Sequence, residues 1–148
     1  MDGFSPILGS VRQPVFEGLN CAGVAAKTIA EMIGVSPPTV SKWRTGKAQI
    51  PAASLVFLTL ILAHLIEDAE TMERRFNDIG TRWDGALDEQ LTTMRRLLHE
   101  QEVLTATLAS DVVHAGARLY RDWLQSNRAA PRSVQTTRQG DVSRDLRG

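Results

Sequence analysis

An almost uniformly apolar segment from Leu55 to Ile66 limits the folds open to this chain. Only two of its 12 residues, Thr59 and His64, carry polar side chains, so a helix formed here must be covered on several sides. The segment is shorter than the roughly 20 apolar residues that span a bilayer. We therefore expect a buried core helix and no contact with a membrane.

The remaining composition favours an all-α fold. Aromatic residues make up only 5% of the 148 residues, and most of the apolar content comes from Leu, Ala, Val and Ile, which suit helix packing better than a β-sandwich. The net charge is zero but unevenly distributed. Residues 51–102 carry ten acidic and five basic groups, whereas residues 1–50 and the segment from 125 onward are each net basic. Any contact with a polyanion is therefore expected at the two ends.

Sequence motifs for catalysis or metal binding are missing. Cys21 is the only cysteine, and no secretion signal begins the sequence, so we expect a cytoplasmic protein without disulfides. The three histidines are dispersed, and the Gly46-Lys47 pair is followed by Ala48 where a phosphate-binding loop needs Ser or Thr. We expect no enzyme activity, no cofactor and no metal.

Turn signals predict three short helices before the apolar segment. The first lies around residues 14–19. The second has its apolar groups on one face and ends at Gly34, which is suited to a helix C-terminus. Ser36 is a good N-cap for a third helix, which starts at Pro37 and runs to about Thr45. The apolar segment then begins a fourth helix over residues 52–77.

A heptad-like seam follows the fourth helix. Its apolar residues are spaced by four, three and four positions, and we expect it to join two copies of the chain through Leu87, Leu91, Met94 and Leu98. A continuous helix from Thr81 to Ser126 would be about 70 Å long at about 1.5 Å per residue. Such a helix either folds back near residues 105–110 or at Gly116, or is covered by a second copy, and we favour a dimer.

The sequence thus divides into three parts. We expect an N-terminal helical domain over residues 1–80, a helical region for oligomerisation or partner binding over residues 81–128, and a disordered arginine-rich tail over residues 129–148.

The tight turn at residues 34–36 predicts a helix-turn-helix. Val40 and Trp43 point inward together, which leaves the opposite face of the third helix for solvent. Short hydroxyls, an ammonium and apolar rings on that face suit the base edges of a major groove. The expected base contacts are Pro37, Pro38, Ser41, Lys42 and Thr45. The expected phosphate contacts are Lys27, Thr28, Ser36, Thr39, Arg44, Lys47 and Gln49.

Residues 24–51 resemble the helix-turn-helix of lambda-repressor-like regulators, the Cro/C1 or Xre type. The resemblance lies in the runs Ile29-Ala30-Glu31-Met32-Ile33-Gly34-Val35-Ser36 and Pro38-Thr39-Val40-Ser41-Lys42-Trp43, followed by Gly46-Lys47 and Pro51. It implies a bundle of four or five helices, operator binding as a dimer and no cofactor. The chain departs from the family at Ala25, where a capping Ser or Thr is common, and in its long C-terminal helical region.

The expected function is therefore a dimeric transcriptional regulator that binds double-stranded DNA. Two alternatives stay open. One is a phage-type packaging adaptor similar to small terminase subunits. The other is an antitoxin-like protein that binds a partner protein through its C-terminal helices.

Overall fold

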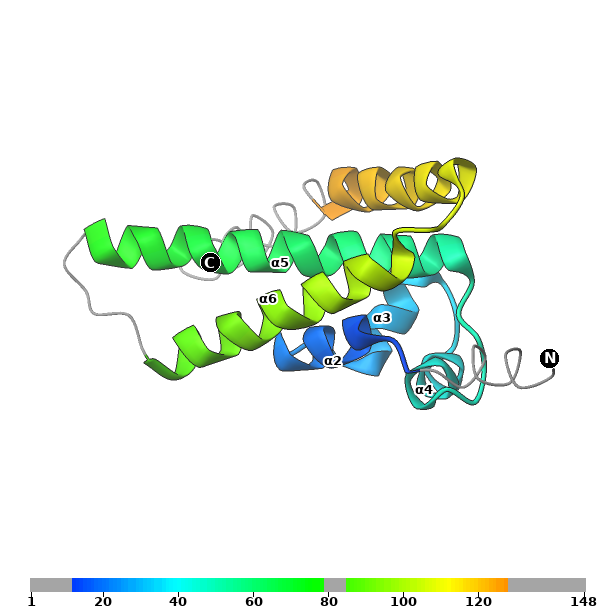
Figure 1. Ribbon diagram of the computed structural model, residues 1–148, viewed down its shortest axis with the longest axis horizontal. Coiled ribbons are helices and arrows are strands. Elements are labelled where there is room, and N and C mark those ends of the chain that lie inside the picture. Colours follow the sequence, from blue (N-terminus) through cyan, green and yellow to red (C-terminus); the bar gives the residue numbers. More distant parts are fainter. Residues whose placement is uncertain (1–11, 79–84, 128–148) are drawn as a thin grey trace, which may run out of the picture.

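The computed structural model describes residues 12–78 and 85–127, which form six helices and no strand. The expected all-α fold is thereby confirmed. The helices are α2 (Pro14–Cys21), α3 (Ala26–Ile33), α4 (Pro37–Thr45), α5 (Ala52–Asp78), α6 (Gly85–Thr105) and a helix over residues 110–127 (Figure 1). The expected tail over residues 129–148 and the side chain of Leu87 lie outside the described residues.

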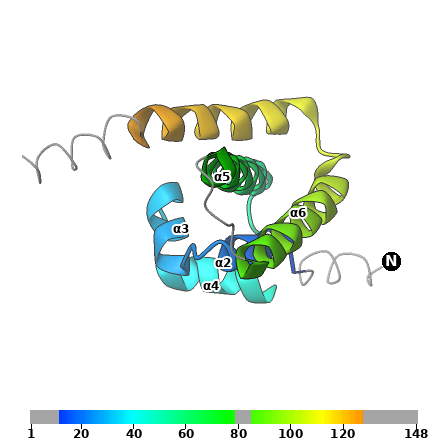
Figure 2. The ribbon, with the colours of Figure 1, turned by 90° about the vertical axis from the view of Figure 1, so that its left-hand side faces the viewer.

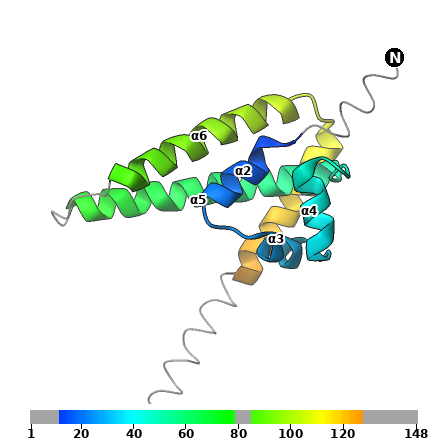
Figure 3. The same cartoon turned by 90° about the horizontal axis from the view of Figure 1, so that it is seen from below.

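Helix α5 forms the centre of the molecule. Viewed along its axis, it is surrounded by α3, by α2 and α4, by α6 and by the 110–127 helix (Figure 2). Its side chains Phe57, Leu58, Ile61 and Leu62 are at most 1% exposed. Figure 3 shows α3 and α4 gathered at the end where α5 begins, while α6 runs alongside most of its length. The apolar segment is thus the buried core helix that the sequence predicts.

Helix α5 extends well beyond the apolar segment from Leu55 to Ile66. Residues Ala52–Arg75 are long and apolar enough to cross a membrane by length and composition alone. A core helix meets the same criterion, and here the first half of α5 is packed inside a helical bundle.

The chain folds back after α6, which is the first of the three arrangements considered for the long C-terminal region. Residues 106–109 form a turn, and the 110–127 helix then packs against α5. Gly116 allows close approach, because a Cβ atom there would lie 2.5 Å from the Val56 side chain and 2.8 Å from the Ala53 carbonyl oxygen. Tyr120 adds a hydrogen bond of 3.2 Å between its hydroxyl and His64 Nδ1.

The seam on α6 is packed within the chain, whereas the sequence was expected to join two copies through it. Leu91 and Met94 are 3% and 4% exposed and belong to the same core cluster as the buried residues of α5, with Leu98 packed against it. A heptad-like spacing places these side chains on one face, but that spacing is equally compatible with packing inside one chain. The helices from both sides of the expected boundary at residue 80 therefore share one core.

Two glutamines of α6 hold the ends of α2. The side chain of Gln101 is fully buried, and its Oε1 accepts a hydrogen bond of 2.8 Å from the backbone N–H of Val15. Its Nε2 donates to Gln13 Oε1 at 3.0 Å. At the other end of α2, Gln90 Nε2 donates to the carbonyl oxygen of Cys21. Because α2 has only eight residues, this support compensates for a helix too short to be stable alone.

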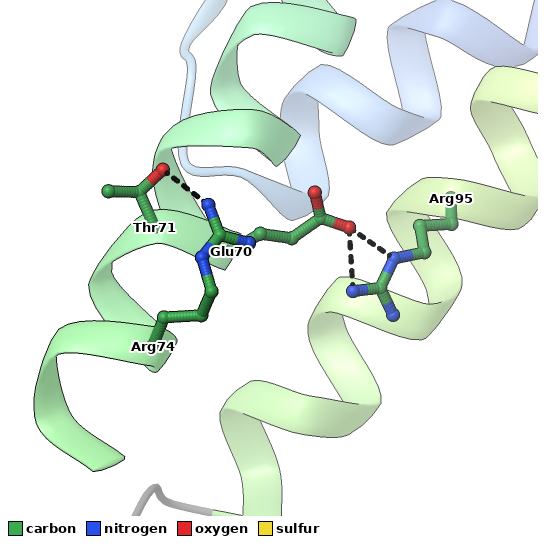
Figure 4. A network of polar contacts seen from close by, with 4 residues as sticks. All are labelled: Glu70, Thr71, Arg74 and Arg95. Atoms are coloured by element: carbon green, nitrogen blue, oxygen red, sulfur yellow. Dashed lines mark hydrogen bonds and ion pairs between the residues drawn. The ribbon is translucent and has the colours of Figure 1, made fainter. Parts of the chain in front are cut away.

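Polar contacts also join the second half of α5 to α6. Arg95 donates from Nε and Nη2 to one carboxylate oxygen of Glu70, at 2.9 and 2.8 Å, close to a hydrogen bond from Arg74 to Thr71 (Figure 4). Nearby, a hydrogen bond with Asp88, together with partial desolvation, raises the pKa of Glu73. These groups are partly exposed and contribute little to stability.

Replacing Gln101 should destabilise the fold. In Gln101→Leu, the Val15 N–H loses its partner in a dry environment, so we expect a loss of about 1–3 kcal/mol in the free energy of unfolding. Urea denaturation followed by circular dichroism measures this. Gln125→Leu, at an exposed glutamine, is the control and should change the value by less than about 0.5 kcal/mol. Equal effects of the two changes would contradict the capping role of Gln101.

Gly116→Ala should also destabilise the protein, against the usual trend. Alanine in an open helix position is more stable than glycine by about 0.5–1 kcal/mol. At Gly116 the added methyl meets Val56 and a backbone oxygen of α5, and we expect a net loss of about 1–3 kcal/mol. Amide hydrogen exchange should show faster exchange confined largely to residues 110–127. A stabilised variant would mean that this helix does not pack closely on α5.

Candidate nucleic-acid interface

The turn between α3 and α4 has the geometry expected of a helix-turn-helix. Gly34 adopts a φ of +88°, a left-handed conformation in which glycine is favoured. The carbonyl oxygen of Ala30 accepts hydrogen bonds from the N–H groups of Gly34 and Val35, at 2.8 and 3.0 Å. Ala30 itself is 2% exposed, as expected for a small residue where two helices meet. The chain therefore ends one helix and starts the next within three residues.

Helix α4 has one buried face and one exposed face. Val40 is completely buried and Trp43 is 6% exposed, and both belong to the core cluster. The predicted inward direction of these two side chains is confirmed. The residues expected to contact bases are all exposed: Pro37, Pro38, Ser41, Lys42 and Thr45.

The polar groups of this exposed face differ in their availability. Thr45 Oγ1 donates within α4 to the carbonyl oxygens of Ser41 and Lys42, at 3.1 and 3.3 Å. In the part of the chain that the structure describes, the side chains of Ser41 and Lys42 have no hydrogen-bond or ionic partner. Both can therefore bind an external group without breaking an internal contact.

The start of α4 offers few backbone donors. Pro37 and Pro38 have no N–H, and the Ser36 side chain does not cap the helix but shares a hydrogen bond of 2.9 Å with Thr39 Oγ1. Ser36 thus occupies the N-cap position that the sequence predicts, but its side chain does not make the usual capping hydrogen bond. Side chains, more than the helix terminus, are thus the chemical groups that α4 presents.

The residues expected to contact phosphates are less uniform. Lys27, Thr28, Ser36, Lys47 and Gln49 are exposed. Thr39 and Arg44 are only half-exposed. Arg44 borders a cavity of about 320 Å³ together with residues of α2 and Glu100 of α6, so its side chain lies at the flank of the exposed face.

The start of α3 leaves backbone donors available. Ala25 is its N-cap residue, and no side chain caps the helix there. The first N–H groups of an α-helix have no partner within the helix, and Lys27 and Thr28 lie in the same turn. An anion at this position would meet backbone donors, a lysine and a hydroxyl together.

The charges of this region are strongly biased. The whole chain has only three lysines, at positions 27, 42 and 47. All three are exposed, and none has a carboxylate partner among the described residues. Residues 26–51 contain one acidic side chain, Glu31. The two helices and the following turn thus carry unpaired positive charge in a molecule whose net charge is zero.

Comparisons of the chain with protein-family models, with curated proteins and with solved structures give no match. The resemblance of residues 24–51 to lambda-repressor-like regulators stays a prediction from the sequence.

A groove beside this region was not predicted. It has a volume of about 740 Å³ and lies between α3 and the 110–127 helix, with α5 at its floor. Its walls come from segments about 90 residues apart in the sequence, so no local pattern marks it. Only the fold-back after α6 brings the walls together.

The turn can be tested by the conformation that it requires at residue 34. A Cβ atom at Gly34 would have open space around it, so substitutions there measure backbone strain alone. We expect Gly34→Val to cost more than Gly34→Asn, by about 1 kcal/mol in the free energy of unfolding, because asparagine tolerates positive φ and valine does not. Thermal and urea unfolding of both variants measure the difference. Equal stabilities would contradict the left-handed turn.

Proposed function

We propose that the protein binds double-stranded DNA through the exposed face of α4 and acts as a transcriptional regulator. The observation that carries the proposal is the division of α4 into a face fixed in the core by Val40 and Trp43 and an exposed face with unpartnered Ser41 and Lys42. A helix held in this way presents its side chains on a rigid support. Its diameter suits the major groove of B-form DNA.

The chemistry of the exposed face supports base recognition. A serine hydroxyl donates to or accepts from several base edges, and a lysine reaches the acceptors of guanine. The rings of Pro37 and Pro38 have no N–H and suit apolar contact, for instance with a thymine methyl group. Such a face combines polar readout with a small apolar surface.

The surrounding residues support contacts with phosphates. The uncapped start of α3 and the exposed Lys27 and Lys47 offer donors and positive charge on both sides of α4. Phosphate contacts of this kind position a recognition helix without reading sequence. Nine of the 17 acidic residues lie on α5 and α6, and Glu31 is the one acidic residue of α3 and α4.

Selection from a random duplex library tests the proposal. At about 150 mM salt, nonspecific phosphate contacts are weakened, so we expect enrichment of one sequence motif. An inverted repeat with half-sites about 34 Å apart would indicate a two-fold dimer. Uniform recovery of all sequences would contradict sequence-specific regulation.

Two substitutions should separate base contacts from phosphate contacts on the selected duplex. Ser41→Ala should reduce affinity for the selected site about fivefold and relax its preference at one base position, since it removes one hydrogen-bonding group. Lys47→Ala should weaken binding to all duplexes by a similar factor and reduce the slope of log K against log salt by about one. Fluorescence anisotropy at several salt concentrations measures both.

Arg75→Ala is the matched control for charge, because Arg75 is exposed near the far end of α5 from α4. It should leave affinity and salt dependence unchanged. If Ser41→Ala and Lys47→Ala bind like the parent protein, the assignment of α4 to the major groove is wrong.

A further inference from the structure

The groove between α3 and the 110–127 helix has the size and lining of a small-molecule site. Its volume of about 740 Å³ lies within the range of about 300–1,000 Å³ that is common for ligand pockets. Its apolar lining includes Met32 of α3, Phe57 of α5 and Leu119 of the 110–127 helix. Leu119 is 44% exposed, so the groove leaves an apolar side chain uncovered.

The charges around the groove have one sign. Glu31 contributes a carboxylate from α3 and Asp122 contributes one from the opposite wall. The lining contains no lysine or arginine, and neither carboxylate forms an ion pair within the described part of the chain. A cation with an apolar body complements such a surface, whereas an anion would be repelled.

A buried hydroxyl at the floor of the groove has no partner. Ser54 of α5 is 8% exposed and lines the groove, and its side chain makes no hydrogen bond within residues 12–78 and 85–127. By contrast, the buried Thr59 hydroxyl of the same helix donates to the carbonyl oxygen of Leu55 at 2.8 Å. Buried polar groups in proteins are normally satisfied, so Ser54 marks where a polar end of a ligand would lie.

An aromatic ring is fixed in the wall beside these groups. Trp123 lines the groove and contacts His64 edge-to-face, with ring centroids 5.7 Å apart, and stacks with Tyr120 at 6.3 Å. These contacts hold the indole in place before any ligand binds. An aromatic ring beside a site that binds a cation adds attraction for the positive charge of the ligand.

We propose that this groove binds amphipathic organic cations, namely primary amines with an aromatic or aliphatic body. The apolar body lies against Phe57, Leu119 and Trp123. The ammonium group donates hydrogen bonds to Ser54 Oγ and is attracted by Glu31 and Asp122. This proposal rests on the groove alone and not on DNA binding, although Thr28, an expected phosphate contact, also lines the groove.

Calorimetric titration of the full chain with matched naphthalene derivatives tests the proposal. The four ligands are 1-naphthylmethylammonium, its N,N,N-trimethyl analogue, 1-naphthylmethanol and 1-naphthylacetate, at pH 7 and about 50 mM salt. We expect saturable 1:1 binding of the primary ammonium, at least about tenfold tighter than binding of the anion, with the neutral alcohol between them.

Variants assign the effect to the named groups. Glu31→Gln combined with Asp122→Asn should reduce the preference for cation over anion to about twofold or less, with little effect on the alcohol. Glu89→Gln combined with Glu102→Gln removes the same charge from exposed positions on α6 and should retain the preference. Ser54→Ala should reduce the affinity for the primary ammonium several-fold. It should leave the affinity for the trimethyl analogue unchanged, because that ligand has no N–H to donate.

Three results would overturn the proposal. They are equal affinities for cation, alcohol and anion, a charge preference that survives the Glu31 and Asp122 substitutions, and the absence of saturable binding up to about 1 mM ligand. Self-association that Leu119→Asp abolishes, together with no ligand binding, would assign the groove to a second copy of the chain instead.

Discussion

The arrangement of the helices follows from the need to shield the apolar half of α5 from water on every side. Phe57, Leu58, Ile61 and Leu62 are almost completely buried, and the other described helices surround α5 (Figure 2). Burial of such side chains contributes about 1.5–3 kcal/mol each, so the whole fold depends on this coverage. Helix α4 takes part in it through Val40 and Trp43. Its opposite face is consequently held rigid and exposed, which is the property that a recognition helix requires.

Close packing around α5 depends on a few special positions. Gly18 of α2 and Gly116 of the 110–127 helix bring their helices so near that an added Cβ atom would collide with α5 side chains. The buried Gln101 then supplies a hydrogen-bonding partner at the start of α2, where backbone groups would otherwise be left unpaired. Apolar coverage thus determines which helices meet, and glycines and glutamines determine how closely and in which register they do so.

Local signals in the sequence were sufficient to predict α3, α4 and the tight turn between them, but not the arrangement of the C-terminal half. Gly34, Pro37 and Gly46 fix helix ends through backbone conformation, which neighbouring residues alone determine. The seam at Leu91 and Met94 shows an apolar face, but the spacing does not tell whether the same chain or a second copy covers it. The turn at residues 106–109 contains neither glycine nor proline, so its position depends on contacts of Gly116 and Tyr120 with α5. For the same reason the groove beside α3 could not be predicted.

If the exposed face of α4 and its flanks bind duplex DNA, the lysines on and beside this face should be protected by it. Acetylation modifies lysine side chains, and the three lysines of the chain lie at positions 27, 42 and 47. Within the described part of the chain, mass spectrometry of the acetylated protein therefore reports on this surface. The experiment compares acetylation rates with and without mixed-sequence duplex DNA at about 50 mM salt, where phosphate contacts are strong. We expect saturating DNA to slow acetylation of all three lysines several-fold, relative to a free lysine peptide in the same solution. Unchanged rates at all three positions would contradict DNA binding at this face.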